Sequence, residues 1–131
     1  MNKKIPPLVE SLIKAGFPSP ADDPVETSLN LHELMVKKPA ATFFIRVAGD
    51  SMKEAGILDG DILVVDRSIS QVENKVVVAR INDEFTVKRL KKIEQRYVLF
   101  PENPAYPPLV IPEGADFEVW GVVTYAIHRL A

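Results

Sequence analysis

A serine and a lysine are the two side chains of this sequence whose types and spacing best suit chemistry. Ser51 lies in the short segment 49–52 (GDSM), between two runs rich in aromatic and β-branched residues. Such runs predict strands, so Ser51 should sit on a turn that leaves one of them. Gly49 lets this turn approach another chain closely. The position suits a nucleophile, although glycine, aspartate and serine are also ordinary turn residues.

Lys88 is the expected partner of this serine. It follows Ser51 by 37 positions (88 − 51), in the alternating run 84–90 (EFTVKRL). Alternation places Thr86, Lys88 and Leu90 on one strand face, which predicts partial burial of the lysine. Burial lowers a lysine pKa, and a neutral lysine can accept the proton of a serine hydroxyl. A strand lysine can equally be a solvated edge residue, and the residues alone leave that alternative open.

The surrounding pattern predicts a mainly β fold, as a curved or barrel-like antiparallel domain. Asn82 and Asp83 predict a two-residue hairpin turn, which pairs the Lys88 strand with residues 76–79. Residues 101–108 hold four of the eleven prolines and predict an irregular loop. The last strand should bend at Gly121. The predicted strands are 42–48, 62–66, 75–81, 84–91, 97–100, 109–111 and 117–127.

The segment before these strands has a different character, and we expect an arm at 1–28 and a domain at 29–131. In the arm, Leu8 and Leu12 are four positions apart and allow one or two helical turns. Prolines further along prevent a longer helix or strand pairing. An extended arm suits a peptide that must enter an active site, and a disordered tail is the alternative.

One short helix is predicted at the start of the domain. Asn30 can cap it, with Glu33 three residues later as in a capping box. Pro39 should end it. His32 then lies on the surface of this helix.

Composition limits the number of domains and the kinds of binding site that the chain can form. A chain of 131 residues suits one domain, and a net charge of −2 gives no indication of direct, specific DNA binding. There is no cysteine, which excludes disulfides and thiol nucleophiles. His32 and His128 lack ligand-like spacing. We therefore expect no metal and no cofactor.

Hydropathy gives no sign of a membrane protein. No apolar run reaches the length of a membrane span. The basic start of the chain is followed by Pro6, Pro7 and Glu10, which interrupt any signal-peptide core. The expected location is the cytoplasm.

Several blocks, in order, resemble the LexA/UmuD family of self-cleaving serine peptidases, and the pattern is nearer to the UmuD branch than to LexA. The spacing between Ser51 and Lys88 agrees with the spacing of the serine and lysine in that family. The resemblance extends from about residue 13 to the end of the chain. The blocks are 15–20 (AGFPSP), 49–52 (GDSM), 59–61 (DGD), 84–90 (EFTVKRL), 100–106 (FPENPAY) and 119–123 (VWGVV).

The resemblance implies self-cleavage between Ala15 and Gly16 in the arm. Ser51 would attack the Ala15 carbonyl and Lys88 would accept its proton. The developing oxyanion needs donors, and turn N–H groups are a natural source. We expect the backbone amides of Asp50 and Ser51 to supply them.

The resemblance also implies partners. Cleavage would be stimulated by a RecA–single-stranded-DNA filament during the SOS response to DNA damage. The trimmed protein would then join a UmuC-like Y-family polymerase in error-prone translesion synthesis. A homodimer is expected as well, and the apolar run 119–127 offers an edge for pairing.

Three other functions compete with this one. A catalytically idle module that binds the polymerase or RecA is the first, although Ser51, Lys88, Ala15 and Gly16 are all present. A LexA-like repressor needs a DNA-binding domain, and fewer than twenty residues precede Gly16. A type I signal peptidase would share the serine and lysine but should carry a membrane anchor.

Overall fold

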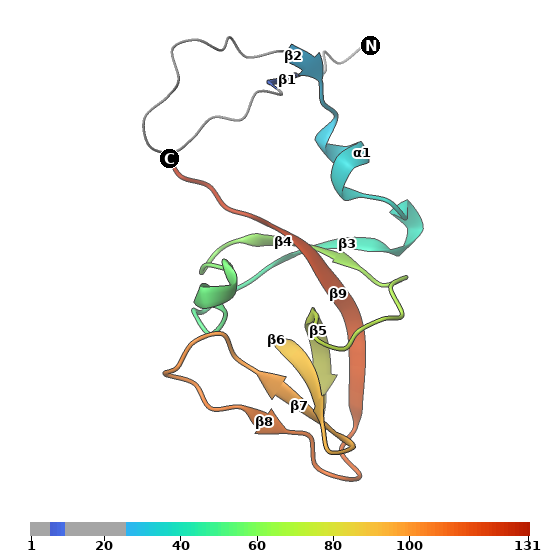
Figure 1. Cartoon of the computed structure of the whole chain (residues 1–131), viewed down its shortest axis with the longest axis vertical. Coiled ribbons are helices and arrows are strands. Elements are labelled where there is room, and N and C mark those ends of the chain that lie inside the picture. The colour runs from blue at the N-terminus through green and yellow to red at the C-terminus, as the bar shows by residue number, and fades with distance from the viewer. Residues whose placement is uncertain (1–5, 10–25) are drawn as a thin grey trace. The chain divides into compact units, whose positions relative to one another are not determined.

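The computed structural model describes residues 6–9 and 26–131 (Figure 1). The chain divides into two compact units, Met1–Met35 and Val36–Ala131, and each is described by itself. In the described residues, no helix is long and apolar enough to cross a membrane.

In its described residues, the first unit contains one strand pair and one short helix. Strand β1 (Pro7–Val9) pairs antiparallel with β2 (Glu26–Ser28). The expectation of helical turns from Leu8 is therefore wrong at β1. The glycine and prolines at 16–24, which were expected to prevent further pairing, lie outside the described residues. Three residues suffice for this ladder, and β1 begins at a proline, where the missing N–H is tolerated.

The helix of this unit is α1 (Leu31–Met35). The Glu33 amide donates to Asn30 Oδ1 at 3.2 Å, which is the predicted cap. His32 is exposed on this helix. The predicted start of α1 is thus confirmed.

The second unit is one seven-stranded antiparallel sheet, which confirms the mainly β prediction. The sheet is open, because β3 and β8 lie at the two ends of the strand order β3-β4-β9-β5-β6-β7-β8. The strands are β3 (Thr42–Arg46), β4 (Ile62–Asp66), β5 (Val76–Ile81), β6 (Glu84–Ile93), β7 (Arg96–Phe100), β8 (Leu109–Val110) and β9 (Phe117–Ile127). All seven fall within one or two residues of their predicted bounds.

The long strand β9 joins two parts of this sheet, as its path in Figure 1 shows. Its first half pairs with β5 and its second half pairs with β4. The register with β5 shifts between Val78 and Ala79, opposite Gly121 and Val119. A Cβ at Gly121 would lie 2.6 Å from Val65 Cγ1, so only glycine fits this irregularity without displacement.

The β5–β6 hairpin sets the register of Lys88. Asn82 and Asp83 form its turn with φ of 47° and 68°. Positive φ at both positions fits a type I′ turn, whose twist matches that of the flanking strands. The turn places Lys88 opposite Val77, within the predicted partner segment.

Strand β5 is buried on both faces, and each face contributes to one core cluster. Val78 packs in a cluster with Met52, Ile57, Leu63 and Val65. Val77 and Ala79 pack in a second cluster with Leu90, Leu99 and Val122. Burial of these side chains is the main stabilising contribution to the sheet. It also gives the site a rigid base.

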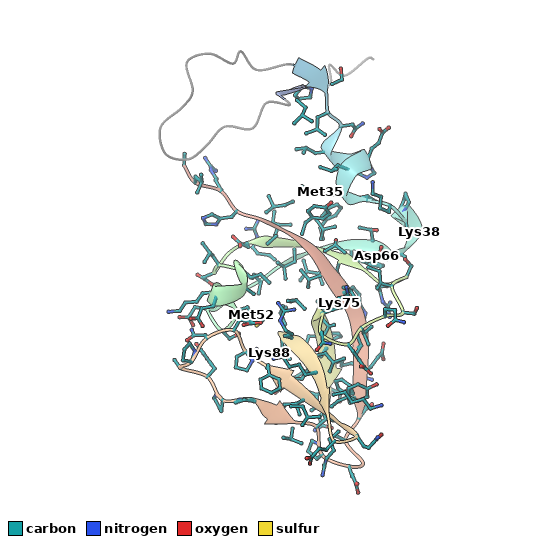
Figure 2. The ribbon with its side chains drawn as sticks, viewed as in Figure 1. Met35, Lys38, Met52, Asp66, Lys75 and Lys88 are labelled. Atoms are coloured by element: carbon teal, nitrogen blue, oxygen red, sulfur yellow. The ribbon has the colours of Figure 1, made fainter. Side chains whose placement is uncertain are left out.

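Two short 3₁₀ turns, which the sequence did not predict, complete the unit. They are η1 (Pro39–Ala41) and η2 (Lys53–Ala55). The second begins two residues after Ser51, so the serine lies between the end of β3 and a helical turn. In Figure 2, Lys88 and Met52 mark β6 and the loop before η2.

Candidate active site

Ser51 lies on a loop that is held at both ends. Before it, Gly49 has φ of 91°, a conformation that favours glycine. The Gly49 amide donates to Asp59 Oδ1 at 2.7 Å, which ties the loop to the turn before β4. After it, Met52 is 3% exposed and packs into the core. Ser51 itself is half-buried between these anchors.

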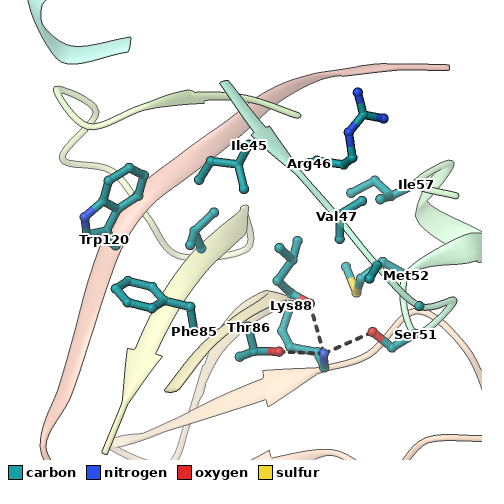
Figure 3. Close-up of a pocket in the computed structure, with 14 residues that line it drawn as sticks. Ile45, Arg46, Val47, Ser51, Met52, Ile57, Phe85, Thr86, Lys88 and Trp120 are labelled. Carbon is teal, nitrogen blue, oxygen red and sulfur yellow. Dashed lines mark hydrogen bonds between the residues drawn. The ribbon is translucent and has the colours of Figure 1, made fainter. Parts of the chain in front are cut away.

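Lys88 projects from β6 toward this loop (Figure 3). Lys88 lies on the same strand face as the fully buried Leu90, and its side chain is partly buried, as the alternation predicted. This burial lowers the pKa of Lys88 below its ordinary value of 10.5.

The lysine amine and the serine hydroxyl are in hydrogen-bond contact. Lys88 Nζ lies 3.0 Å from Ser51 Oγ, 2.8 Å from Thr86 Oγ1 and 3.1 Å from the Val87 carbonyl oxygen (Figure 3). A neutral amine has two N–H donors and one lone pair. Thr86 and the Val87 carbonyl can take both donors, which leaves the lone pair directed at the Ser51 hydroxyl. The arrangement is therefore suited to proton transfer from serine to lysine.

A pocket of about 540 Å³ opens beside this pair. Its walls are mainly apolar, and Ser51 and Lys88 are among its lining residues. One wall comes from the end of β3 with Ile45, and another from Phe85 and Trp120 (Figure 3). The two rings meet edge to face with centroids 6.3 Å apart. The pocket can hold the apolar side chains of an extended peptide against the serine.

The expected oxyanion donors lie on the same loop. The backbone amides of Asp50 and Ser51 donate to no other residue in the described part of the chain. Both N–H groups are therefore available to an external oxygen, which is what an oxyanion donor requires.

Two predicted residues fall outside the described part of the chain. Ala15 and Gly16, the expected cleavage site, both lie in the segment 10–25, outside the described residues. The described residues hold no cluster of side chains that could bind a metal. His128 instead bonds through Nδ1 to the buried Asp61 at 2.8 Å.

Several residues of the site were missed from the sequence. Alternation predicts that Thr86 shares the face of Lys88, but it does not by itself indicate that the Thr86 hydroxyl bonds to the amine. Its spacing of two residues in a strand was the available signal. Trp120 and Ile45 reach the pocket from distant segments, and nothing local in the sequence signals that placement.

The chain is similar to several known proteins over most of its length. The chain is 47% identical to protein SamA of Salmonella typhimurium over 94% of this chain and 85% of SamA. It is 49% identical to protein MucA of Escherichia coli, over 88% of this chain and 79% of MucA. It is also 41% identical to the LexA repressor of Proteus mirabilis, over 89% of this chain and 58% of the repressor.

The family described as Peptidase S24-like matches residues 7–124, which is most of the sequence. The Ser51 loop, the Lys88 strand and the apolar pocket all lie inside the matched range. The chain belongs to the Peptidase S24-like family.

Proposed function

We propose that this protein is a self-cleaving serine peptidase that cuts its own chain between Ala15 and Gly16. The 3.0 Å contact between Ser51 Oγ and Lys88 Nζ is the observation that supports this most strongly. Residues 1–28 act as the arm that carries the substrate peptide, and residues 29–131 form the peptidase-like domain.

In the first step, Ser51 Oγ attacks the Ala15 carbonyl carbon while its proton passes to Lys88 Nζ. The carbonyl oxygen becomes an oxyanion that accepts hydrogen bonds from the Asp50 and Ser51 amides. The Ala15–Gly16 C–N bond then breaks, and Lys88 returns the proton to the leaving Gly16 amine. An ester between Ala15 and Ser51 remains.

In the second step, water attacks this ester with Lys88 again as the base. The products are a carboxylate at Ala15 and the restored Ser51 hydroxyl. The lysine must be neutral at the start of each step, and the burial that lowers its pKa supports that role.

The biological role follows the LexA/UmuD resemblance. The trimmed protein is a homodimeric accessory subunit of a UmuC-like Y-family polymerase in SOS mutagenesis, and a RecA–single-stranded-DNA filament stimulates its cleavage. Family membership and the similarity to SamA and MucA support this placement.

Incubation of the purified chain tests the proposal. We expect slow conversion to a fragment that begins at Gly16, identified by N-terminal sequencing and intact mass. Ser51→Ala should remain uncut while keeping the circular dichroism spectrum of the parent. A Gly16 fragment from folded Ser51→Ala protein, in a protease-free preparation, would remove Ser51 from the mechanism.

A further inference from the structure

The loop between β7 and β8 contacts the backbone on both sides of Ser51. The Glu102 amide donates to the Ser51 carbonyl oxygen at 2.9 Å. Asn103 Nδ2 donates to the Asp50 carbonyl oxygen at 2.9 Å. Two consecutive residues of a distant loop thus hold the two peptide units that flank the serine.

The Asn103 contact has a consequence for the amide of Ser51. The Asp50 carbonyl and the Ser51 N–H belong to one planar trans peptide unit, so they point in opposite directions. Fixing the carbonyl therefore fixes the direction of the N–H. The Lys53 amide also reaches this carbonyl, at 3.2 Å, but from within the same loop. Asn103 is the anchor that comes from outside it.

Asn103 is itself rigidly placed. It is 5% exposed, and its Oδ1 accepts the Ala105 amide at 3.0 Å. This contact fixes which end of the side-chain amide faces Asp50, because only the NH₂ end can donate. A buried amide with both ends bonded has little freedom to move.

The same loop is tied to the strand that carries the lysine. Arg89 Nε donates to Glu102 Oε1 at 2.5 Å, and Arg89 adjoins Lys88 on β6. Arg89 Nη1 also donates to the Asn74 carbonyl. Glu102 thus connects the Ser51 backbone to β6, so the loop is fixed relative to both members of the pair.

We propose that Asn103 is a positioning residue for the cleavage reaction, holding the Ser51 amide in the direction in which it receives the oxyanion. This inference rests on the proposed function. The role is distinct from those of Ser51 and Lys88. Asn103 acts through the Asp50 carbonyl and contacts neither side chain of the pair.

Asn103→Asp isolates the contact. The carboxylate keeps the size of the side chain and can still accept the Ala105 amide, but it cannot donate to the Asp50 carbonyl. We expect the plateau rate constant of cleavage at high pH to fall roughly 10- to 100-fold, as for a misplaced catalytic donor. Tyr106→Phe is the matched control. It removes the 2.7 Å bond from the same loop to the Asp50 side chain and leaves the backbone contacts intact.

The pH profile separates positioning from a general loss of structure. Loosening of the whole site would expose Lys88 to water and move the midpoint of the profile to higher pH. A lost amide orientation lowers the plateau and leaves the midpoint unchanged. Asn103→Asp with the parent plateau, or with a lowered plateau and a midpoint shifted to higher pH, would overturn the proposal.

A second variant tests the proposal if Asn103→Asp does not fold. Asn103→Ser keeps a hydroxyl that can accept the Ala105 amide, but it is too short to reach the Asp50 carbonyl. It should show the same lowered plateau, and a parent-like plateau in folded Asn103→Ser would equally overturn the proposal. Failure of the proposed function gives a different result, since the parent itself would then not produce a Ser51-dependent fragment.

Discussion

At Lys88, burial in the site opposes the charge that a lysine amine normally carries. Its amine is partly removed from water, which disfavours the charged form and lowers its pKa. Thr86 Oγ1 and the Val87 carbonyl accept hydrogen bonds from the amine and compensate part of the lost hydration. The same burial that lowers the stability of the ammonium form supplies the neutral base for the proposed reaction.

The lowered pKa of Lys88 predicts a pH-dependent effect of Lys88→Met on stability. The Lys88 pKa is lower in the folded protein than in the unfolded chain, so the unfolded chain binds more protons between the two values. The free energy of unfolding of the parent therefore rises with pH through that interval. Methionine carries no charge, so we expect Lys88→Met to be slightly more stable than the parent at neutral pH. That advantage should shrink toward pH 10.5.

Urea unfolding across this pH range measures the effect, with the exposed Lys75→Met as control. The partial exposure of Lys88 keeps the gain small, because solvent screens the charge. A deficit of Lys88→Met that grows as the pH falls would contradict a lowered Lys88 pKa.

At the scale of elements, the strands were predictable and the loop contacts were not. Alternation and turn residues predicted β4 and β9 to the residue, and they paired the Lys88 strand with residues 76–79, which include its observed partner Val77. Both signals are local, because strand faces and hairpin register depend on neighbours in sequence.

The remaining features depend on distant pairings. The β1–β2 ladder is three residues long, too short for a periodic signal. Asn103 lies in a proline-rich loop, and its contact with Asp50 spans 53 positions. Ser51 and Lys88 were identified through their residue types and through resemblance, whereas Asn103 and Trp120 needed the folded arrangement.

Gly121 offers a test of the bent strand. A methyl group at this position would meet Val65 Cγ1 at 2.6 Å, inside a buried part of the sheet. We expect Gly121→Ala to lower the free energy of unfolding by about 1–3 kcal/mol through overpacking. Chemical denaturation of the purified variant measures this.

A double-mutant cycle supplies the control for Gly121→Ala. Val65→Ala removes the methyl group that the new Cβ would meet, so the alanine at 121 should be less destabilising in that background. Equal penalties in both backgrounds would show that the clash with Val65 is not the cause.

At the scale of the whole molecule, we predict a homodimer before and after cleavage. The second half of β9 pairs with β4 on one side, whereas β5 pairs only with the first half. Within the described residues, one edge of 123–127 is thus without a strand partner, and Tyr125 and Ile127 there are exposed. Such an edge can pair across a two-fold axis.

Sedimentation equilibrium at micromolar concentration measures the state of association. We expect twice the mass of one chain for the intact protein and for the trimmed product. One chain's mass in either form would count against the dimer.

The central claim is that Lys88 takes the proton of Ser51 when the chain cuts itself, and the pH dependence of spontaneous cleavage tests it most directly. Intact mass would be followed from about pH 6 to 10 in the parent and in Lys88→Arg, with circular dichroism to confirm folding. The parent rate should rise with pH and level off below 10.5, because only the neutral lysine is active and its pKa is lowered. Arginine keeps the charge but stays protonated throughout this range, so Lys88→Arg should remain uncut at every pH. A flat profile in the parent, or a Gly16 fragment from Lys88→Arg, would show that another group accepts the proton.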